Sequence, residues 1–189
     1  MKILAFAASL RQGSYNRKLI KEAAALLRFH SDLVLDHADY REFEMPIFDG
    51  DLEERSGIPA GGREFIRRIQ GADGLVIATP EYNGGIPGTL KNAIDWSSRN
   101  DPDPLEGKPV LLLGTSPGRF GAVRGLWHTR VPFEAIGAYV YPEVFALPLA
   151  REAFDPSDRF IDPKNRDRLG ALLTAYLQYV GSLSRRIDR

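Results

Sequence analysis

Ile3-Leu4-Ala5-Phe6-Ala7-Ala8 opens the chain as a short apolar run, and the polar stretch Ser9-Leu10-Arg11-Gln12-Gly13-Ser14-Tyr15-Asn16-Arg17 follows it directly. A run of this length without polar alternation predicts a strand that is buried on both faces, as in a parallel sheet. After the polar stretch, apolar residues recur at helical spacing, which predicts a helix from about Asn16 to Phe29. A strand, a polar loop and a helix in this order indicate the beginning of an α/β fold.

The same alternation continues along the chain. Further apolar runs cover residues 74–79, 110–115 and 138–147, the last interrupted by Pro142, and a weaker run covers 33–35. Between and after them, helical spacing is marked by Phe65, Ile66 and Ile69, by Leu90, Ala93 and Ile94, by Val123, Leu126, Trp127 and Val131, and by the stripe from Leu169 to Ile187. This alternation predicts a doubly wound α/β sheet within a single domain over residues 1–189.

The polar stretches predict where the chain is irregular. Residues 46–62, 101–108 and 152–167 are expected to be loops. Pro132 is expected to break or kink the helix around it, because proline lacks the N–H that a helix needs.

Composition excludes several classes of function. The 25 Lys and Arg residues balance 25 Asp and Glu residues, so nucleic acid is not an expected partner. The chain has no cysteine, which excludes thiol nucleophiles, disulfides and protein-ligated iron–sulfur clusters, and its three histidines lack the spacing of metal ligands, so no metal is expected. No stretch approaches the about 20 apolar residues that span a bilayer, so no membrane association is expected and the expected location is cytoplasmic.

Ligands of such sheets bind beyond the carboxyl ends of the strands, so the loops after Ala8, Thr79 and Thr115 are the candidate site. The first loop opens a helix, where free backbone N–H groups and the helix dipole favour an anion. Ser9, Arg11, Ser14 and Asn16 are the donors it adds. They predict a phosphate site, although Ser14 could be a plain N-cap and Arg11 a solvated side chain. Neither a Walker A motif nor G-x-G-x-x-G is present, which favours a monophosphate ligand.

The second loop, residues 79–92, is rich in glycine and proline. Its backbone N–H groups suit the edge of a flat heterocycle, and Tyr82 offers an aromatic contact. The alternative is an ordinary turn with Tyr82 packed on the end of the sheet. The third loop, residues 114–121, again places small residues and a hydroxyl at a strand end, which is a weak signal by itself.

Together the three loops carry a family resemblance. The motifs are Ser9-Leu10-Arg11-x-x-Ser14-x-Asn16-Arg17, then Pro80-Glu81-Tyr82-Asn83-Gly84-x-Ile86-Pro87-Gly88-x-Leu90-Lys91-Asn92-Ala93-Ile94-Asp95-Trp96, and then Ser116-Pro117-Gly118. In them the chain resembles the NADPH-dependent FMN reductase family, the flavodoxin-like quinone and azo-dye reductases. Three positions depart from the family pattern: Ala8 and Gly85, which stay small, and Arg119, where glycine is common.

The resemblance implies a flavodoxin-like, five-stranded parallel sheet in the order 2-1-3-4-5, with helices on both faces and one FMN per subunit. Carried over residue by residue, it implies that Ser9, Arg11, Ser14 and Asn16 hold the FMN phosphate. It likewise implies that Pro80, Glu81, Tyr82 and Asn83 border the isoalloxazine and that Ser116 and Gly118 close its other side. Arg119 either lies near the pyrimidine edge of the flavin or points into solvent.

The implied activity is an NAD(P)H-dependent FMN or quinone reductase without a catalytic side chain of its own. NADPH or NADH would reduce FMN and leave, and an acceptor would then take two electrons; a quinone, an azo dye, chromate and free flavin are all candidates. A flavodoxin-type electron carrier or a flavin-sensing module is the alternative, and the zero net charge disfavours the carrier. A helix from Pro87 to Trp96 is expected to form a dimer or tetramer interface, unless Trp96 packs on its own sheet.

Overall fold

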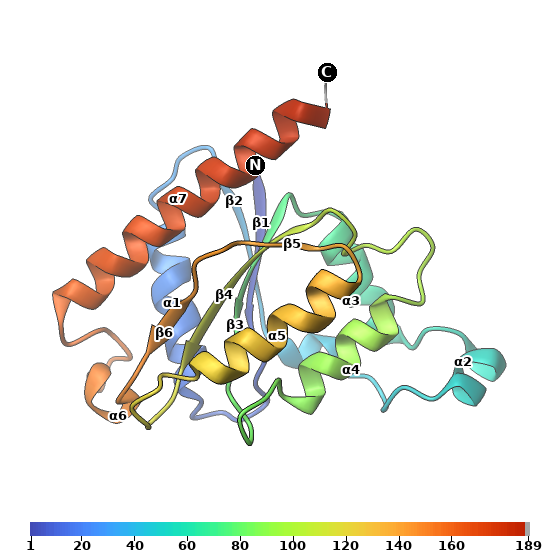
Figure 1. The fold of residues 1–189 in the computed structure, drawn as a ribbon, viewed down its shortest axis with the longest axis horizontal. Helices are drawn as coiled ribbons and strands as arrows, with labels where there is room; N and C mark the ends of the chain where they lie inside the picture. The colour runs from blue at the N-terminus through green and yellow to red at the C-terminus, as the bar shows by residue number, and fades with distance from the viewer. Residues whose placement is uncertain (188–189) are drawn as a thin grey trace.

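A computed structural model describes residues 1–187 and contains a six-stranded parallel sheet (Figure 1). Its strands are β1 (Lys2–Ala7), β2 (Val34–Ala38), β3 (Gly74–Ala78), β4 (Pro109–Thr115), β5 (Tyr139–Val140) and β6 (Phe145–Leu147). The order β2-β1-β3-β4-β5 confirms the predicted topology. The last apolar run forms two short strands, of which β5 pairs with the beginning of β4 and β6 with its end.

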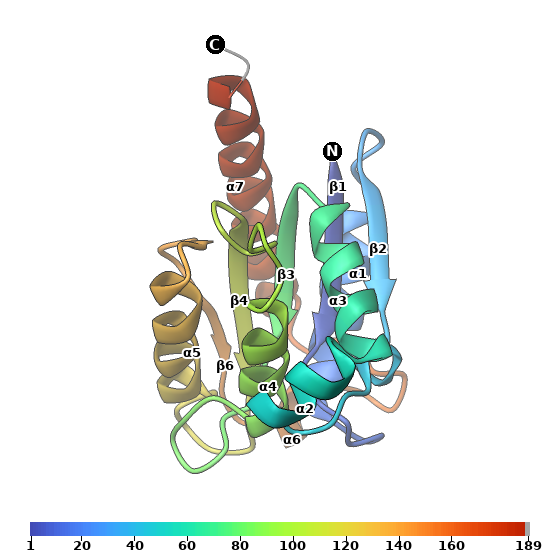
Figure 2. The same cartoon turned by 90° about the vertical axis from the view of Figure 1, so that its right-hand side faces the viewer.

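The helices cover both faces of the sheet, as Figure 2 shows. They are α1 (Tyr15–Leu27), the 3₁₀ helix η1 (Tyr40–Phe43), α2 (Gly50–Ser56), α3 (Ala60–Gln70), α4 (Gly88–Ser97), α5 (Val123–Ala135), α6 (Ala150–Ala153) and α7 (Pro163–Ile187). Buried residues of α1 and α7 form one apolar core with the sheet, and those of α3, α4 and α5 form another. Because β1, β3 and β4 lie between these two cores, nearly all of their side chains are buried, which explains their continuous apolar runs.

Two predicted loops contain helices, and the break that Pro132 could cause is absent. The predicted loop 46–62 contains α2 and the beginning of α3; α2 buries none of its residues, so no apolar periodicity marks it. The predicted loop 152–167 contains the end of α6 and the first turn of α7. Helix α5 continues through Pro132 to Ala135 instead of breaking, and the fully buried Leu126 and Phe133 hold it on either side of the proline.

Trp96 does not mark an interface. Its side chain is fully buried, and its indole Nε1 donates to the backbone oxygen of Pro46 at 2.8 Å. The ring also packs edge-on against Phe48, with 5.0 Å between ring centroids. The residue therefore holds the segment before α2 against α4, and the apolar face that was expected there is already covered within the subunit.

Within residues 1–187, none of the helices combines the length and the apolar character that crossing a membrane requires.

Candidate active site at the carboxyl edge of the sheet

The three loops meet because β1, β3 and β4 are adjacent in the sheet. All three strands end at the lower edge of Figure 1, where the loops gather. A buried amide joins two of them: Asn16 Nδ2 donates to the backbone oxygen of Thr115 at 3.1 Å, and Asn16 Oδ1 accepts from the Thr115 N–H at 3.0 Å. The side chain of Asn16 therefore connects the first loop to the third.

At the beginning of α1, the first loop has hydrogen-bond donors that are available to a ligand. Ser14 is the N-cap, and its hydroxyl oxygen accepts the N–H of Asn16 at 3.2 Å. The backbone N–H groups of residues 10–13 and 15 donate to no acceptor among the residues that the structure describes. Arg11 is exposed and, within the same residues, has no ion-pair partner, whereas Ser9 is buried. Free N–H groups, a helix N-terminus and a guanidinium suit a phosphate.

The second loop forms a tight turn at the end of β3. Tyr82 and Gly85 exchange two backbone hydrogen bonds of 3.1 and 3.0 Å, and the residues between them, Asn83 and Gly84, have positive φ angles of 52° and 78°. These are the features of a type I′ hairpin turn, which favours Asn-Gly. Tyr82 is 52% exposed, so its ring is open to a ligand rather than packed in the core.

Glu81 holds this turn against α5. Its side chain is only 8% exposed, and its carboxylate accepts hydrogen bonds from the Gly125 N–H at 3.0 Å and from the Arg124 guanidinium at 2.9 Å. Burial acts to raise the pKa of Glu81, but the hydrogen bonds from Gly125 and Arg124 outweigh it and hold the pKa below its ordinary value. Glu81 therefore stays ionised at neutral pH, which argues against a role as proton donor.

The third loop is bonded to a segment for which the sequence predicted no functional role. We call residues 149–162 the strap. The N–H groups of Leu149 and Ala150 donate to the backbone oxygens of Gly118 at 3.2 Å and Ser116 at 3.0 Å. Arg119 is exposed in this loop and has no ion-pair partner in the described part of the chain.

Ion pairs fasten the strap to α1. Glu22 is a buried carboxylate of α1 that binds Arg159 of the strap and, at 2.9 Å, Arg166 of α7. Asp158 of the strap binds Lys18 and Lys21, each at 2.8 Å. Because α1 begins at the first loop, the strap connects that loop with the third.

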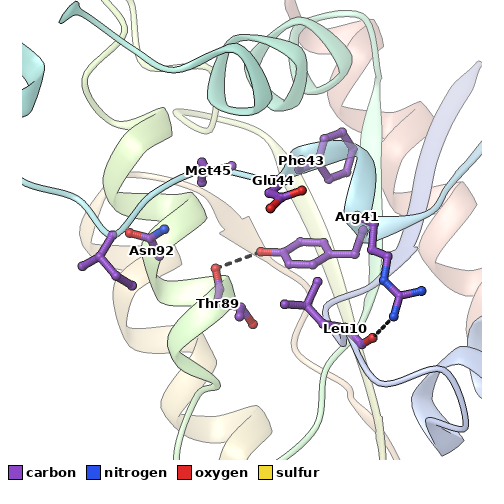
Figure 3. Close-up of a pocket in the computed structure, with 9 residues that line it drawn as sticks. Leu10, Arg41, Phe43, Glu44, Met45, Thr89 and Asn92 are labelled. Atoms are coloured by element: carbon purple, nitrogen blue, oxygen red, sulfur yellow. Dashed lines mark hydrogen bonds between the residues drawn. The ribbon is translucent and has the colours of Figure 1, made fainter.

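A pocket of about 250 Å³ borders the first loop through Leu10, between η1 and the beginning of α4 (Figure 3). Arg41 donates to the backbone oxygen of Leu10, and the Tyr40 hydroxyl donates to that of Thr89 at 2.9 Å. Leu10, Met45 and Ile47 contribute apolar surface to the wall. No sequence motif pointed to this pocket, because its residues come from three separate segments.

The family model of the NADPH-dependent FMN reductases matches residues 1–152. The NAD(P)H-dependent FMN reductase PA1204 of Pseudomonas aeruginosa is 37% identical over 185 residues, 97% of each chain, and the quinone reductase of Escherichia coli is 35% identical over 186 residues, 95% of each chain. The solved structure of FerB, a flavoenzyme NAD(P)H:(acceptor) oxidoreductase from Paracoccus denitrificans, superposes with a TM-score of 0.83 at 27% identity, covering 96% of this chain and 97% of FerB.

The family match spans all three loops, and the relatives match almost the whole chain, including the strap. The donor set of the first loop, with its free N–H groups and Arg11, fits the phosphate of FMN. The open Tyr82 turn beside it fits a flat ring. The fold, the loop geometry and the relatives agree: the chain is an oxidoreductase that belongs to the NADPH-dependent FMN reductase family, with FMN as cofactor and NAD(P)H as co-substrate.

Proposed function

We propose that the protein transfers electrons from NAD(P)H through FMN to a quinone, by a two-step exchange in which the two substrates use the same face of the flavin in turn. The observation that carries the proposal is the row of unused backbone N–H groups at residues 10–13, beside the open turn of Tyr82. FMN, when bound, supplies the two-electron chemistry. Residues of the chain bind it, orient it and leave one face accessible.

In this proposal the FMN phosphate binds at the first loop. Ser9, Arg11 and Ser14 surround the phosphate, and the free backbone N–H groups donate to it. The Asn16 amide bonds to Thr115 through both its nitrogen and its oxygen, so we assign it the task of holding the first and third loops together.

The isoalloxazine would lie between the second and third loops. Pro80, Tyr82 and Asn83 border it, Ser116 and Gly118 close the other side, and Glu81 fixes the turn to α5. Arg119 faces solvent beside this position and can meet either the flavin edge or a substrate. The lowered pKa of Glu81 supports a mechanism in which no side chain of this turn donates a proton.

Among the candidate acceptors, a quinone suits the pocket beside the first loop better than chromate, an azo dye or free flavin. The pocket beside Leu10 has apolar walls and, at about 250 Å³, lies just below the roughly 300–1,000 Å³ of ordinary ligand sites, so it suits a single small ring. We place the enzyme in the cytoplasm, as proposed from the sequence.

The visible absorption spectrum tests the proposal. The purified protein is expected to show a flavin spectrum that bleaches after anaerobic addition of NADPH without any acceptor, and to recover its colour when a benzoquinone is added. Reduction without an acceptor is required by the two-step exchange. A protein that stays yellow with both NADPH and NADH would contradict the enzymatic proposal, and one that fails to bind added FMN would contradict the cofactor site.

We also propose that the protein forms a dimer or a tetramer, now on a different surface. Phe120, Trp127 and Val131 leave 65%, 57% and 64% of their surfaces exposed along and just before α5, an apolar stripe that favours an interface. Light scattering at micromolar concentration is expected to give at least twice the subunit mass of 21.1 kDa, and Trp127→Glu is expected to reduce it to one subunit. A monomeric mass for the unmodified protein would contradict the proposal.

A further inference from the structure

A second, smaller cavity lies at the same edge of the sheet, between α1 and the end of β2. Its volume is about 200 Å³. Arg17 and Lys21 of α1 line it from one side, and His37 with Asp39 line it from the other. Arg17 is only three residues beyond the N-cap Ser14, so the cavity adjoins the proposed phosphate loop without including its donors.

Arg17 is incompletely bonded in this cavity. Its Nη2 donates to Asp39 Oδ2 at 2.7 Å, but its Nη1 is buried and has no hydrogen-bond partner. Among the residues that the structure describes, no other buried side-chain nitrogen or oxygen lacks a partner. Leaving a charged donor unsatisfied is unfavourable, so a ligand acceptor in the cavity would give Arg17 the missing partner once its guanidinium turns toward it.

Positive charge exceeds negative charge around the cavity. Burial is the largest cause that lowers the pKa of His37, and the positive charges of Arg28, Lys21 and Arg17 lower it further. The negative charge of Asp39 acts in the opposite direction and raises it. Of the lining cations, Lys21 also binds Asp158 outside the cavity and remains 58% exposed, so its ammonium can still reach an anion. The chemistry of the cavity is therefore that of an anion site with a guanidinium as its main donor.

The size of the cavity indicates which kind of ligand it takes. About 200 Å³ is below the roughly 300–1,000 Å³ of pockets that enclose a whole small molecule. The cavity therefore suits a phosphate group at one end of a longer ligand, whose other end would lie elsewhere along the carboxyl edge of the sheet. NADPH has this form, because its reactive nicotinamide and its adenosine 2′-phosphate are at opposite ends.

We propose that the cavity between Arg17, Lys21 and His37 binds the 2′-phosphate of NADPH and so makes the enzyme favour NADPH over NADH. The inference rests on the proposed function, since it assigns a second contact to the same reductant. Free inorganic phosphate shares this chemistry, and the first experiment distinguishes the two sources.

The first experiment measures binding to the FMN-loaded protein, in which the phosphate loop is filled. Adenosine 2′-monophosphate is titrated while the imidazole C2 proton of His37 is observed by NMR; the chain has three histidines, so a His37→Gln variant assigns the signal. We expect the signal to shift, and the pKa of His37 to rise, at a lower concentration of adenosine 2′-monophosphate than of inorganic phosphate. Equal responses to both compounds, or none, would overturn the inference.

The second experiment compares the two reductants. In Arg17→Met and in Lys21→Met, the ratio of KM for NADPH to KM for NADH is expected to rise roughly tenfold, the effect of losing one charge-assisted hydrogen bond. Arg28→Met removes a nearby cation at the C-cap of α1 that does not line the cavity, and its ratio is expected to stay within twofold of the unmodified enzyme. If Arg17→Met does not fold, Arg17→Lys is measured in its place, because it keeps a positive charge next to Asp39.

Failure of this inference differs from failure of the proposed function. An active enzyme whose ratio does not change in Arg17→Met or Lys21→Met would overturn the NADPH site alone. Weaker FMN binding in Arg17→Met with an unchanged ratio would assign Arg17 to the FMN phosphate instead, and would also overturn it. A protein that oxidises neither nucleotide would overturn the proposed function, and the titration with adenosine 2′-monophosphate would still decide what the cavity binds.

Discussion

Glu22→Gln is expected to lower the free energy of unfolding by about 2 kcal/mol, because a buried carboxylate loses its charge-assisted hydrogen bonds while its two guanidinium partners stay partly exposed. The Glu22 side chain is 2% exposed and faces two guanidinium groups, those of Arg159 and Arg166. An amide in its place cannot neutralise them, and its NH₂ group would point at one of them. Urea denaturation at neutral pH measures the change.

The same substitution is expected to weaken FMN binding roughly tenfold, which corresponds to about 1.4 kcal/mol. Glu22 holds Arg159 of the strap, and the strap holds the backbone of Ser116 and Gly118 in the third loop. Fluorescence titration of the apoprotein with FMN, below the unfolding transition, separates this effect from loss of folded protein. The pH dependence of FMN binding is expected to stay that of the unmodified protein, because Glu22 lies outside the three loops of the proposed FMN site.

Glu64→Gln is the matched control for Glu22→Gln. Glu64 binds Arg67 on the surface of α3, one helical turn away, at 2.6 Å. Such exposed pairs contribute little to stability, so this variant is expected to denature and to bind FMN as the unmodified protein does. If Glu22→Gln were no more harmful than Glu64→Gln, the strap would not be held by the buried pair.

The sequence predicted the sheet well, because β1, β3 and β4 are buried on both faces and their apolar runs have few other interpretations. The three loops of the site were found for the same reason, since each follows one of these strands. Helix α2 was missed because nothing on it is buried. Trp96 was misjudged because a large aromatic residue late in a helix is compatible with a subunit interface and with a contact to a distant segment; its partners, Pro46 and Phe48, are about fifty positions away.

The ion pairs that hold the strap leave only a partial signal in the sequence. Glu22 lies on the apolar face of α1, next to Leu19 and Ala23, where a charge needs a partner. That position predicts a buried ion pair, but not that the partners are Arg159 and Arg166, more than a hundred residues away in the chain. The assignment of individual site residues to FMN, and the single domain over residues 1–189, stay predictions.

Gly125→Ala is expected to lower the free energy of unfolding by about 1–3 kcal/mol, the usual cost of overpacking, and to weaken FMN binding at least roughly tenfold. A methyl group at this position would lie 2.8 Å from Cβ and 2.9 Å from Cα of Glu81. The backbone cannot rotate away like a flexible side chain, so the Tyr82 turn must move from α5, and the hydrogen bond from the Gly125 N–H to Glu81 must lengthen. FMN titration and thermal unfolding of the apoprotein measure the two effects.

Gly170→Ala is the same chemical change, but we expect it to have the opposite effect on stability. Gly170 also lies inside a helix, α7, but a methyl group there would lie 3.8 Å from Leu26, an ordinary contact. Without a clash, alanine in place of a helical glycine is expected to stabilise the protein by roughly 0.5–1 kcal/mol and to leave FMN binding unchanged. If Gly125→Ala stabilised the protein as Gly170→Ala does, α5 and the Tyr82 turn would not be in close contact, and the glycine would not be needed to shape the flavin site.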